Sequence, residues 1–233
     1  MTSTRTAALR RLGALPAALV LTLIAVLLLA LPRGGAEAAP ATAHSHGVVV
    51  APHTAAQFAF HDQMRKLWED HVTWTRLAIV AFADGSNGFD ATASRLLQNQ
   101  VDIGNAIKPY YGDAAGDQLT ALLRDHILIA VDVLKAAKSG DSAAFAEANT
   151  RWYANANDIA DFLAAANPRF WPDDVMRAAM KEHLDQTLAE AAHELSGDYA
   201  ASVADYDQVH AHILAMADSL SSGIIGAFPS KIG

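Results

Sequence analysis

Three stretches of the chain share one pattern: LWEDHVTWTRLAIVAFADG at 67–85, LLRDHILIAVDVLKAAKSG at 122–140 and MKEHLDQTLAEAAHELSG at 180–197. In each stretch an acidic residue directly precedes a histidine, and the three histidines are His71, His126 and His183. Each histidine lies fourteen residues before a glycine, at Gly85, Gly140 and Gly197. An acid–histidine pair at a fixed distance from a helix-ending glycine, found three times, indicates an internal repeat.

The segments that follow these glycines also align with one another. They are RLLQNQVDIGNAI at 95–107, RWYANANDIADFL at 151–163 and DQVHAHILAMADSL at 207–220. One aligned position holds Asn99, Asn155 and His212, and a second holds Asn105, Asp161 and Asp218. Each repeat is therefore predicted to be a helix, a turn at the glycine and a second helix.

The fold class follows from this repeat. Hydrophobic residues make up 52% of the chain, and Val and Ile do not gather in short alternating runs, which favours helices over strands. We predict an all-α fold, a six-helix antiparallel bundle built from three repeated hairpins, after an N-terminal hydrophobic segment. Asp90, Asp141 and Asp198 are the expected N-caps. The predicted helices span 55–84, 90–108, 113–139, 141–166, 172–196 and 198–228.

The repeat also predicts which side chains lie at the same height. In an antiparallel hairpin, residues equidistant from the turn are level with each other. The expected pairs are His71 with Asn99, His126 with Asn155, and His183 with His212. Fourteen residues at about 1.5 Å each place this layer roughly 21 Å from the turn. If the hairpins point in one direction, all six side chains share one layer, on the mainly apolar faces of the helices.

These histidines have two interpretations. In the first they are core groups, each satisfied by a hydrogen bond to Asn or His on the partner helix. In the second they bind a transition metal such as Cu, Zn or Fe, because neutral imidazole is a common ligand for these ions. The candidate ligands are His71, His126, His183 and His212, with Asp218 as a weaker one.

Other side chains have simpler expected roles. The tryptophans lie at core-like helical spacings, so core packing is expected of them. Arg76 lies on a largely apolar helix, where an ion pair with an acid of a neighbouring helix is expected. In the linker, His44 and His46 follow a possible cleavage point at Ala43 and are a second candidate site, suited to Cu(II).

Composition and missing motifs exclude several classes. The net charge is −8 and the basic residues are scattered singly, so no nucleic-acid partner is expected. The chain has no cysteine, which excludes disulfides, thiolate metal sites and a cysteine nucleophile. A ferritin-like di-iron site needs two Glu-x-x-His motifs, and only Glu190-Ala-Ala-His193 fits well. No zinc-protease, nucleophile-elbow, phosphate-loop or dinucleotide motif is present, which weighs against an enzyme without excluding one, and we name no catalytic residue.

The N-terminal region indicates export. Arg5, Arg10 and Arg11 precede an uncharged stretch from Leu12 to Pro32, followed by small residues. We interpret 1–40 as a signal peptide or a single membrane anchor, 41–54 as a linker and 55–233 as the helical domain. The domain is then extracytoplasmic, either secreted or held at the membrane by an uncleaved segment.

The chain resembles a family of uncharacterised bacterial helical-bundle proteins, common in soil Gram-positives and given inconsistent enzyme names. LWEDHVTWTR, RLLQNQVDIGNAIKPYYGD and RWYANANDIADFL carry the resemblance, together with Ala217-Asp218 to Phe228-Pro229. It covers about residues 60–230. It implies a standalone helical domain behind an N-terminal hydrophobic segment, and it brings no activity or ligand set.

Three functional hypotheses remain. The first is an extracytoplasmic protein that binds a transition metal through the histidine layer, for binding, sensing or storage. The second is a non-catalytic envelope interaction or structural module with core histidines. The third is a small-ligand carrier or an enzyme with a pocket between hairpins, which requires a cavity that reaches the histidines.

Overall fold

The computed structural model describes residues 50–233. The predicted signal or anchor at 1–40, most of the linker, and His44 and His46 lie outside these residues. Within 50–233, no helix is both long and apolar enough to cross a membrane.

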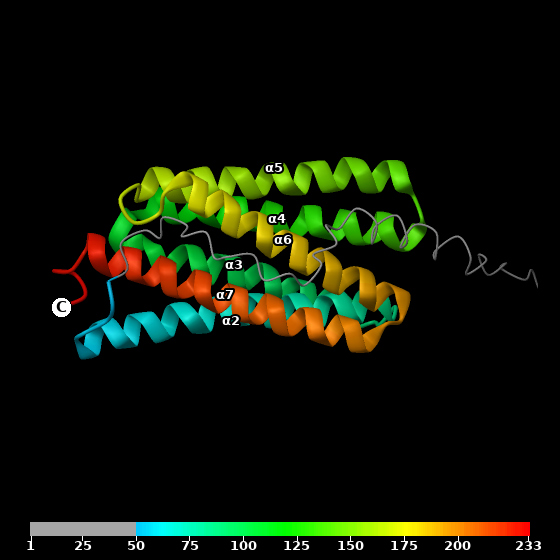
Figure 1. Cartoon of the computed structure of the whole chain (residues 1–233), viewed down its shortest axis with the longest axis horizontal. Coiled ribbons are helices and arrows are strands. Elements are labelled where there is room, and N and C mark those ends of the chain that lie inside the picture. Colours follow the sequence, from blue (N-terminus) through cyan, green and yellow to red (C-terminus); the bar gives the residue numbers. More distant parts are fainter. Residues whose placement is uncertain (1–49) are drawn as a thin grey trace, which may run out of the picture.

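The described chain is an all-α bundle without strands, which confirms the predicted fold class (Figure 1). Each helix contacts its neighbours in sequence, and the last contacts the first, so the six form a closed ring. The helices are α2 (Ala55–Ala83), α3 (Phe89–Tyr111), α4 (Asp113–Ser139), α5 (Ser142–Ala166), α6 (Asp173–Ser196) and α7 (Tyr199–Ala227). The three hairpins point in one direction, because the α2–α3, α4–α5 and α6–α7 connections lie at the same end of the bundle.

The three hairpin turns use the same backbone hydrogen bonds. Each glycine has a positive φ, between 65° and 83°, which only glycine adopts at low energy. The residue after it donates to the carbonyl five residues earlier: Ser86 to Ala81, Asp141 to Ala136 and Asp198 to His193. These bonds satisfy carbonyls at the helix end that have no partner within the helix. The repeat therefore extends to the backbone geometry.

Two of the three predicted N-caps are correct. The side chain of Asp141 accepts from Ala144 N at 3.0 Å, and that of Asp198 accepts from Ala201 N at 3.2 Å. The prediction for Asp90 is wrong. Helix α3 begins one residue earlier, at Phe89, with Gly88 as its cap. Asp90 then lies in the first helical turn, where its charge still interacts favourably with the helix dipole.

The end of α3 also differs from the prediction. We expected the helix to stop before Pro109, but it continues to Tyr111. Proline removes only one backbone donor here, and the helix closes with Gly112 N donating to Lys108 O at 2.9 Å. A proline this close to the end costs the helix little.

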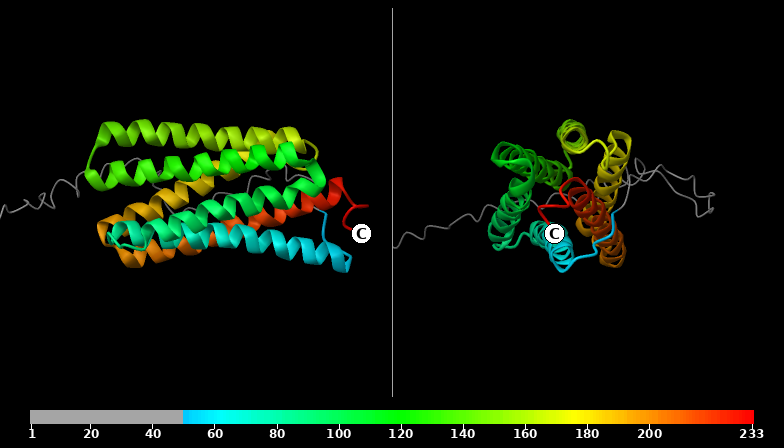
Figure 2. Two further views of the ribbon diagram at one scale, coloured as in Figure 1. Left: turned by 180° about the vertical axis from the view of Figure 1, so that it is seen from behind. Right: turned by 90° about the vertical axis from the view of Figure 1, so that its left-hand side faces the viewer.

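Helices α3 and α4 approach closely near their connecting turn and diverge away from it, as the rear view in Figure 2 shows. The close approach depends on Gly104 and Gly116. A Cβ added at Gly104 would lie 2.5 Å from Gly116 O and 1.9 Å from Thr120 Oγ1. Helix α6 contacts both α2 and α4 across the interior of the ring. In the rear view of Figure 2, α6 therefore lies behind the region in which α3 and α4 diverge.

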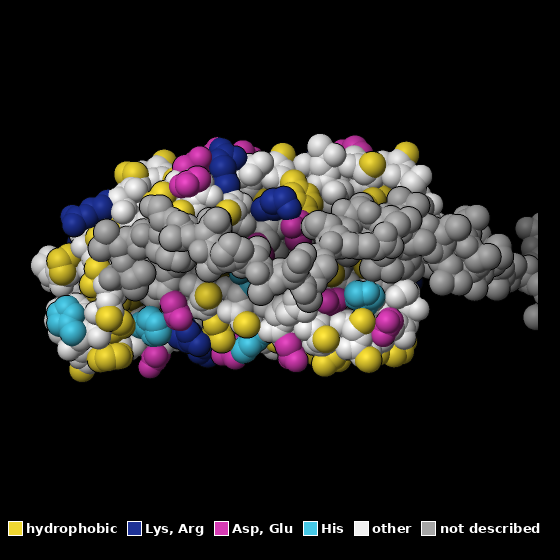
Figure 3. Space-filling view, viewed as in Figure 1, with side chains coloured by type: hydrophobic (Ala, Val, Ile, Leu, Met, Phe, Trp, Pro, Cys, Tyr) yellow, Lys and Arg dark blue, Asp and Glu magenta, His cyan; other side chains and the backbone are white. Residues whose placement is uncertain are grey.

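Most of the interior is apolar, and the surface is mixed. Trp68, Trp152 and Trp171 are buried in the main core, in agreement with the core role expected of them. The same expectation is wrong for Trp74, which is half-buried and has the Arg95 guanidinium 5.3 Å from its ring centroid. On the face shown in Figure 3, basic side chains are separated from one another by acidic and uncharged ones.

Candidate functional site

At the histidine layer, a side chain from the second helix of each hairpin contacts a backbone carbonyl of the first helix. Asn99 Nδ2 donates to Leu67 O at 3.0 Å, and Asn155 Nδ2 donates to Leu122 O at 3.1 Å. In the third hairpin, His212 Nε2 lies 2.9 Å from Ala179 O. Each carbonyl belongs to the residue four before the repeat histidine, one helical turn away. The predicted level pairs are therefore confirmed.

His183 lies at the centre of a cluster of histidine rings. Its ring centroid is 5.7 Å from that of His71, 6.4 Å from that of His126 and 6.3 Å from that of His212. His71, His126 and His183 are all buried. The three hairpins thus bring their repeat histidines together, because they point in one direction around the ring.

His126 has a well-defined hydrogen bond. Its Nδ1 lies 2.8 Å from Asn155 Oδ1, and the amide orientation is set by the bond from Asn155 Nδ2 to Leu122 O. The facing atom is therefore an oxygen, and Nδ1 carries the proton. Burial lowers the pKa of His126 to about 4, although the bond to Asn155 opposes this shift. The ring is neutral at pH 7, and its Nε2 has a free lone pair.

His71 bonds to a different partner from the one that the repeat predicts. Its Nδ1 lies 3.3 Å from Gln100 Nε2, while Asn99 contacts only the backbone and Gln100. Burial, followed by the charge of His126, lowers the pKa of His71 to about 3. Gln100 lies one residue beyond the aligned position, so the alignment missed it.

His183 is the least satisfied of the three. Its Nδ1 is buried and has no hydrogen-bond partner. Burial is the main cause that lowers the pKa of His183 well below its usual value, followed by the charges of His71, His126 and His212. A neutral imidazole with an unpaired nitrogen is costly in a core, so this side chain is unusual for a purely structural group.

His212 lies behind the cluster and presents its ring face to His183, with an angle of 15° between the two rings. Its Nε2 lies against Ala179 O, and its Nδ1 lies 3.7 Å from a carboxylate oxygen of Glu182. Both nitrogens therefore face groups on α6 rather than the other histidines.

A cavity of about 60 Å³ reaches the three buried histidines. It extends from the histidine layer toward the hairpin turns, where α3 and α4 diverge. Besides the histidines, its wall includes the polar side chains of Thr75 and Thr187, whose hydroxyls donate to the carbonyls of His71 and His183 at 2.8 Å. It also includes Trp152, whose indole Nε1 is buried without a hydrogen-bond partner. The other lining residues are Ala78, Ile79, Phe89, Ala93, Leu96, Ile127, Ala130, Val131, Val133, Leu134, Leu188 and Ala191.

The predicted metal ligands do not form one coordination sphere. Within residues 50–233, no group of three or more His, Asp or Glu side chains is arranged to hold a metal ion. Asp218 is apart from the layer, with its Oδ1 2.5 Å from Arg65 Nη1 and 3.0 Å from His61 Nε2. A metal at the layer would require the imidazoles to turn, and metal binding there stays a prediction.

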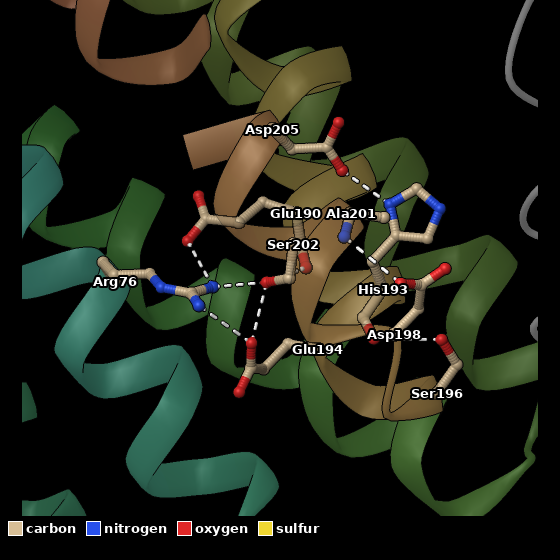
Figure 4. A network of polar contacts seen from close by, with 9 residues as sticks. All are labelled: Arg76, Glu190, His193, Glu194, Ser196, Asp198, Ala201, Ser202 and Asp205. Carbon is tan, nitrogen blue, oxygen red and sulfur yellow. Dashed lines mark hydrogen bonds and ion pairs between the residues drawn. The ribbon is translucent and has the colours of Figure 1, made fainter. Parts of the chain in front are cut away.

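Two buried carboxylates share one arginine near the layer (Figure 4). Arg76 of α2 lies 3.2 Å from Glu190 and 3.0 Å from Glu194 of α6. Ser202 Oγ of α7 donates to Glu194 at 2.7 Å. Burial raises the pKa of Glu190 to about 7, against the opposing charge of Arg76. The ion pair expected for Arg76 is confirmed, but the burial of two glutamates was not predicted.

Glu190 and His193, the one close match to a di-iron motif, take part in separate contacts. Glu190 pairs with Arg76, whereas His193 Nδ1 lies 2.6 Å from Asp205 Oδ2 (Figure 4). The two side chains of this motif therefore have different partners.

Comparisons of the chain with protein-family models, with curated protein sequences and with solved structures give no match. The resemblance to the soil-bacterial family stays a prediction. The functional argument therefore depends on the geometry of the site.

Proposed function

We propose that this protein binds one small, neutral and mostly apolar molecule in the cavity at His71, His126 and His183, as a carrier or sensor. The observation that carries the proposal is an apolar cavity ending at three neutral imidazoles, none of which makes a hydrogen bond through Nε2 within residues 50–233. This is the third hypothesis from the sequence, which required such a cavity. The proposed extracytoplasmic location depends only on the N-terminal sequence.

The wall of the cavity favours a neutral ligand. None of its lining residues is Asp, Glu, Lys or Arg. A charged ligand would lose its hydration there without gaining an opposite charge. The imidazoles do not supply one, because burial lowers the pKa of His71 to about 3 and that of His126 to about 4.

The volume limits the size of the ligand. An engineered cavity of ~150 Å³ in another protein accepts benzene, and a water molecule needs at least roughly 10–15 Å³ on the same kind of measure. The cavity here, at about 60 Å³, lies between these values. It fits a molecule of about three to five non-hydrogen atoms.

Xenon tests the cavity, because it occupies apolar cavities without forming hydrogen bonds. We expect xenon-saturated solution to shift the methyl resonances of Ala93 and Val131, which line the cavity. Ala93→Leu fills the space and should abolish the shift. Ala91→Leu is the matched control, since Ala91 is exposed on the same helix. The proposal fails if wild-type protein shows no saturable xenon site at these residues.

A transition metal is the second candidate. Asn155 accepts from His126 Nδ1, and such a contact is typical of a histidine whose Nε2 binds a metal. The test is metal analysis of protein purified without an affinity tag and loaded with Cu, Zn, Fe or Ni. Less than one bound equivalent of each rejects the metal. One equivalent that is lost in His183→Leu favours it over the small molecule.

A further inference from the structure

We infer that the ligand of this cavity is a short aliphatic alcohol, with its hydroxyl oxygen among His71, His126 and His183 and its alkyl chain along α3 and α4. This inference rests on the proposed function and specifies the chemical class of the ligand. It comes from the hydrogen-bonding capacity that each ring has left after its contacts with protein groups. Within the described chain, no hydrogen bond reaches Nε2 of any of the three rings.

His126 offers an acceptor. Its Nδ1 donates to Asn155 Oδ1, which leaves the lone pair of the neutral ring on Nε2.

His71 offers a donor. Gln100 Nε2 donates to Leu96 O at 2.8 Å and to Asn99 Oδ1 at 3.2 Å, so the atom of Gln100 that faces these two acceptors is its nitrogen. The same nitrogen lies 3.3 Å from His71 Nδ1. An amide nitrogen does not accept a hydrogen bond, so Nδ1 of His71 faces it without a proton. The proton of the neutral His71 ring is then on Nε2.

His183 offers a second donor. One of its two ring nitrogens must carry the proton, and Nδ1 is buried without a partner. Unpaired buried N–H groups are rarer in proteins than unpaired acceptors. The proton is therefore placed on Nε2, where a ligand can accept it.

Two donors and one acceptor match a hydroxyl group. An alcohol oxygen accepts two hydrogen bonds and donates one. A carbonyl or ether oxygen has no proton for His126, and a hydrocarbon has neither function. Two rings that bond to one oxygen at about 2.9 Å have centroids roughly 5.5–7 Å apart. The spacings of 5.7 Å and 6.4 Å around His183 fall in this range.

The remainder of the cavity fits an alkyl chain. Beyond the histidines its wall includes Ala93, Ala130, Val131 and Leu134, all of them apolar. A chain of three or four carbons fills the volume that a single water at the histidines would leave empty. The alcohol therefore gains both the hydrogen bonds and the apolar contacts.

Three probes of equal heavy-atom count test this inference: 1-propanol, 1-chloropropane and methoxyethane. The dissociation constants are measured from the methyl shifts of Ala93 and Val131 in the purified full chain. We expect 1-propanol to bind about tenfold or more tightly than either of the others, since each unmatched hydrogen bond weakens binding. His126→Phe removes the acceptor and should reduce the preference for 1-propanol over methoxyethane to less than about twofold.

The ring protons supply a readout that does not depend on a variant folding. Imidazole ¹⁵N spectra should show the proton on Nδ1 of His126 and on Nε2 of His71 and His183. Equal affinity for the three probes, in protein that binds xenon, overturns the alcohol and leaves the proposed function standing. Absence of binding by all probes and by xenon overturns both. A different tautomer pattern overturns the alcohol alone.

Discussion

Asn155 contacts His126 and the backbone of the facing helix with the two ends of one amide. Its Oδ1 accepts from the ring at 2.8 Å, and its Nδ2 donates to Leu122 O at 3.1 Å. Asn99 and His212 repeat the backbone contact in the other two hairpins. The layer therefore stabilises each hairpin and, in the second one, also fixes which nitrogen of the histidine carries the proton.

Asn155→Ala removes both contacts. It leaves His126 Nδ1 and Leu122 O buried without partners, so we expect the free energy of unfolding to fall by about 2–4 kcal/mol. Urea unfolding followed by circular dichroism measures the change. Asn157→Ala is the control on the exposed side of the same helix and should stay within about 0.5 kcal/mol. An equally small effect of Asn155→Ala would contradict the assigned role.

His212→Asn should be tolerated. Asparagine makes the equivalent backbone contact in the other two hairpins, so we expect the free energy of unfolding to change by less than about 1 kcal/mol. His212→Leu has no donor for Ala179 O and should lose about 1–3 kcal/mol. The comparison uses urea unfolding of the two variants. Equal free energies of unfolding for the two variants would show that the contact to Ala179 O does not contribute to stability.

The sequence was sufficient to predict the heights in the layer. Helices rise by a constant amount per residue, and the glycines at 85, 140 and 197 mark the turns, so counting places His126 level with Asn155. Counting does not determine the rotation of side chains between hairpins. His71 therefore bonds to Gln100 instead of Asn99, a choice made by tertiary packing.

The cavity and the buried acids were beyond sequence reasoning. A filled core and a hollow one require the same apolar pattern, and the space here depends on how α3 and α4 diverge from Gly104 and Gly116. Glu190 lies on the same stripe of α6 as His183, but the sequence gives no sign that Arg76 reaches it from α2.

Gly104→Ala tests the crossing of α3 and α4. The new methyl group would meet Gly116 O at 2.5 Å, and a backbone atom cannot move aside without shifting α4. Overpacking of this kind typically lowers stability by about 1–3 kcal/mol. Gly88→Ala is the control, because the nearest atom to its added methyl is Ser86 Oγ at 3.4 Å. Thermal unfolding should show a clearly lower midpoint for Gly104→Ala, and similar midpoints for both variants would argue against a tight crossing.

The buried histidines should make the protein sensitive to acid. The pKa is about 3 for His71 and about 4 for His126, against 6.5 in the unfolded chain. Below pH 6.5 the unfolded state therefore binds protons that the folded state does not. The free energy of unfolding therefore decreases as the pH is lowered, by up to about 1.4 kcal/mol per pH unit for each ring.

Over the range from pH 6.5 to 4.5, these two rings together should lower the free energy of unfolding by about 4.5 kcal/mol. Urea unfolding of the Glu190→Gln variant measures this change, because Glu190 of the wild type offsets about 2 kcal/mol of it over the same range. His53→Gln changes an exposed histidine and should leave this slope unaltered. NMR titration supplies the direct check, and protonation of His126 near pH 6.5 in the folded protein would refute the assignment.

Glu190 should act in the opposite direction. Its pKa is about 7 in the folded protein and 4.5 in the unfolded chain, so between these values the folded state holds the extra proton. Its contribution to stability is complete below pH 4.5 and is lost as the pH rises to 7, at up to about 1.4 kcal/mol per unit.

Glu190→Gln keeps a neutral side chain beside Arg76 at every pH. Its stability relative to wild type should therefore rise by about 3 kcal/mol from pH 4.5 to 7. Glu182→Gln, at an exposed position of the same helix, should follow the wild-type curve. Parallel curves for Glu190→Gln and wild type would mean that Glu190 is ionised throughout, with Arg76 neutralising it in preference to Glu194.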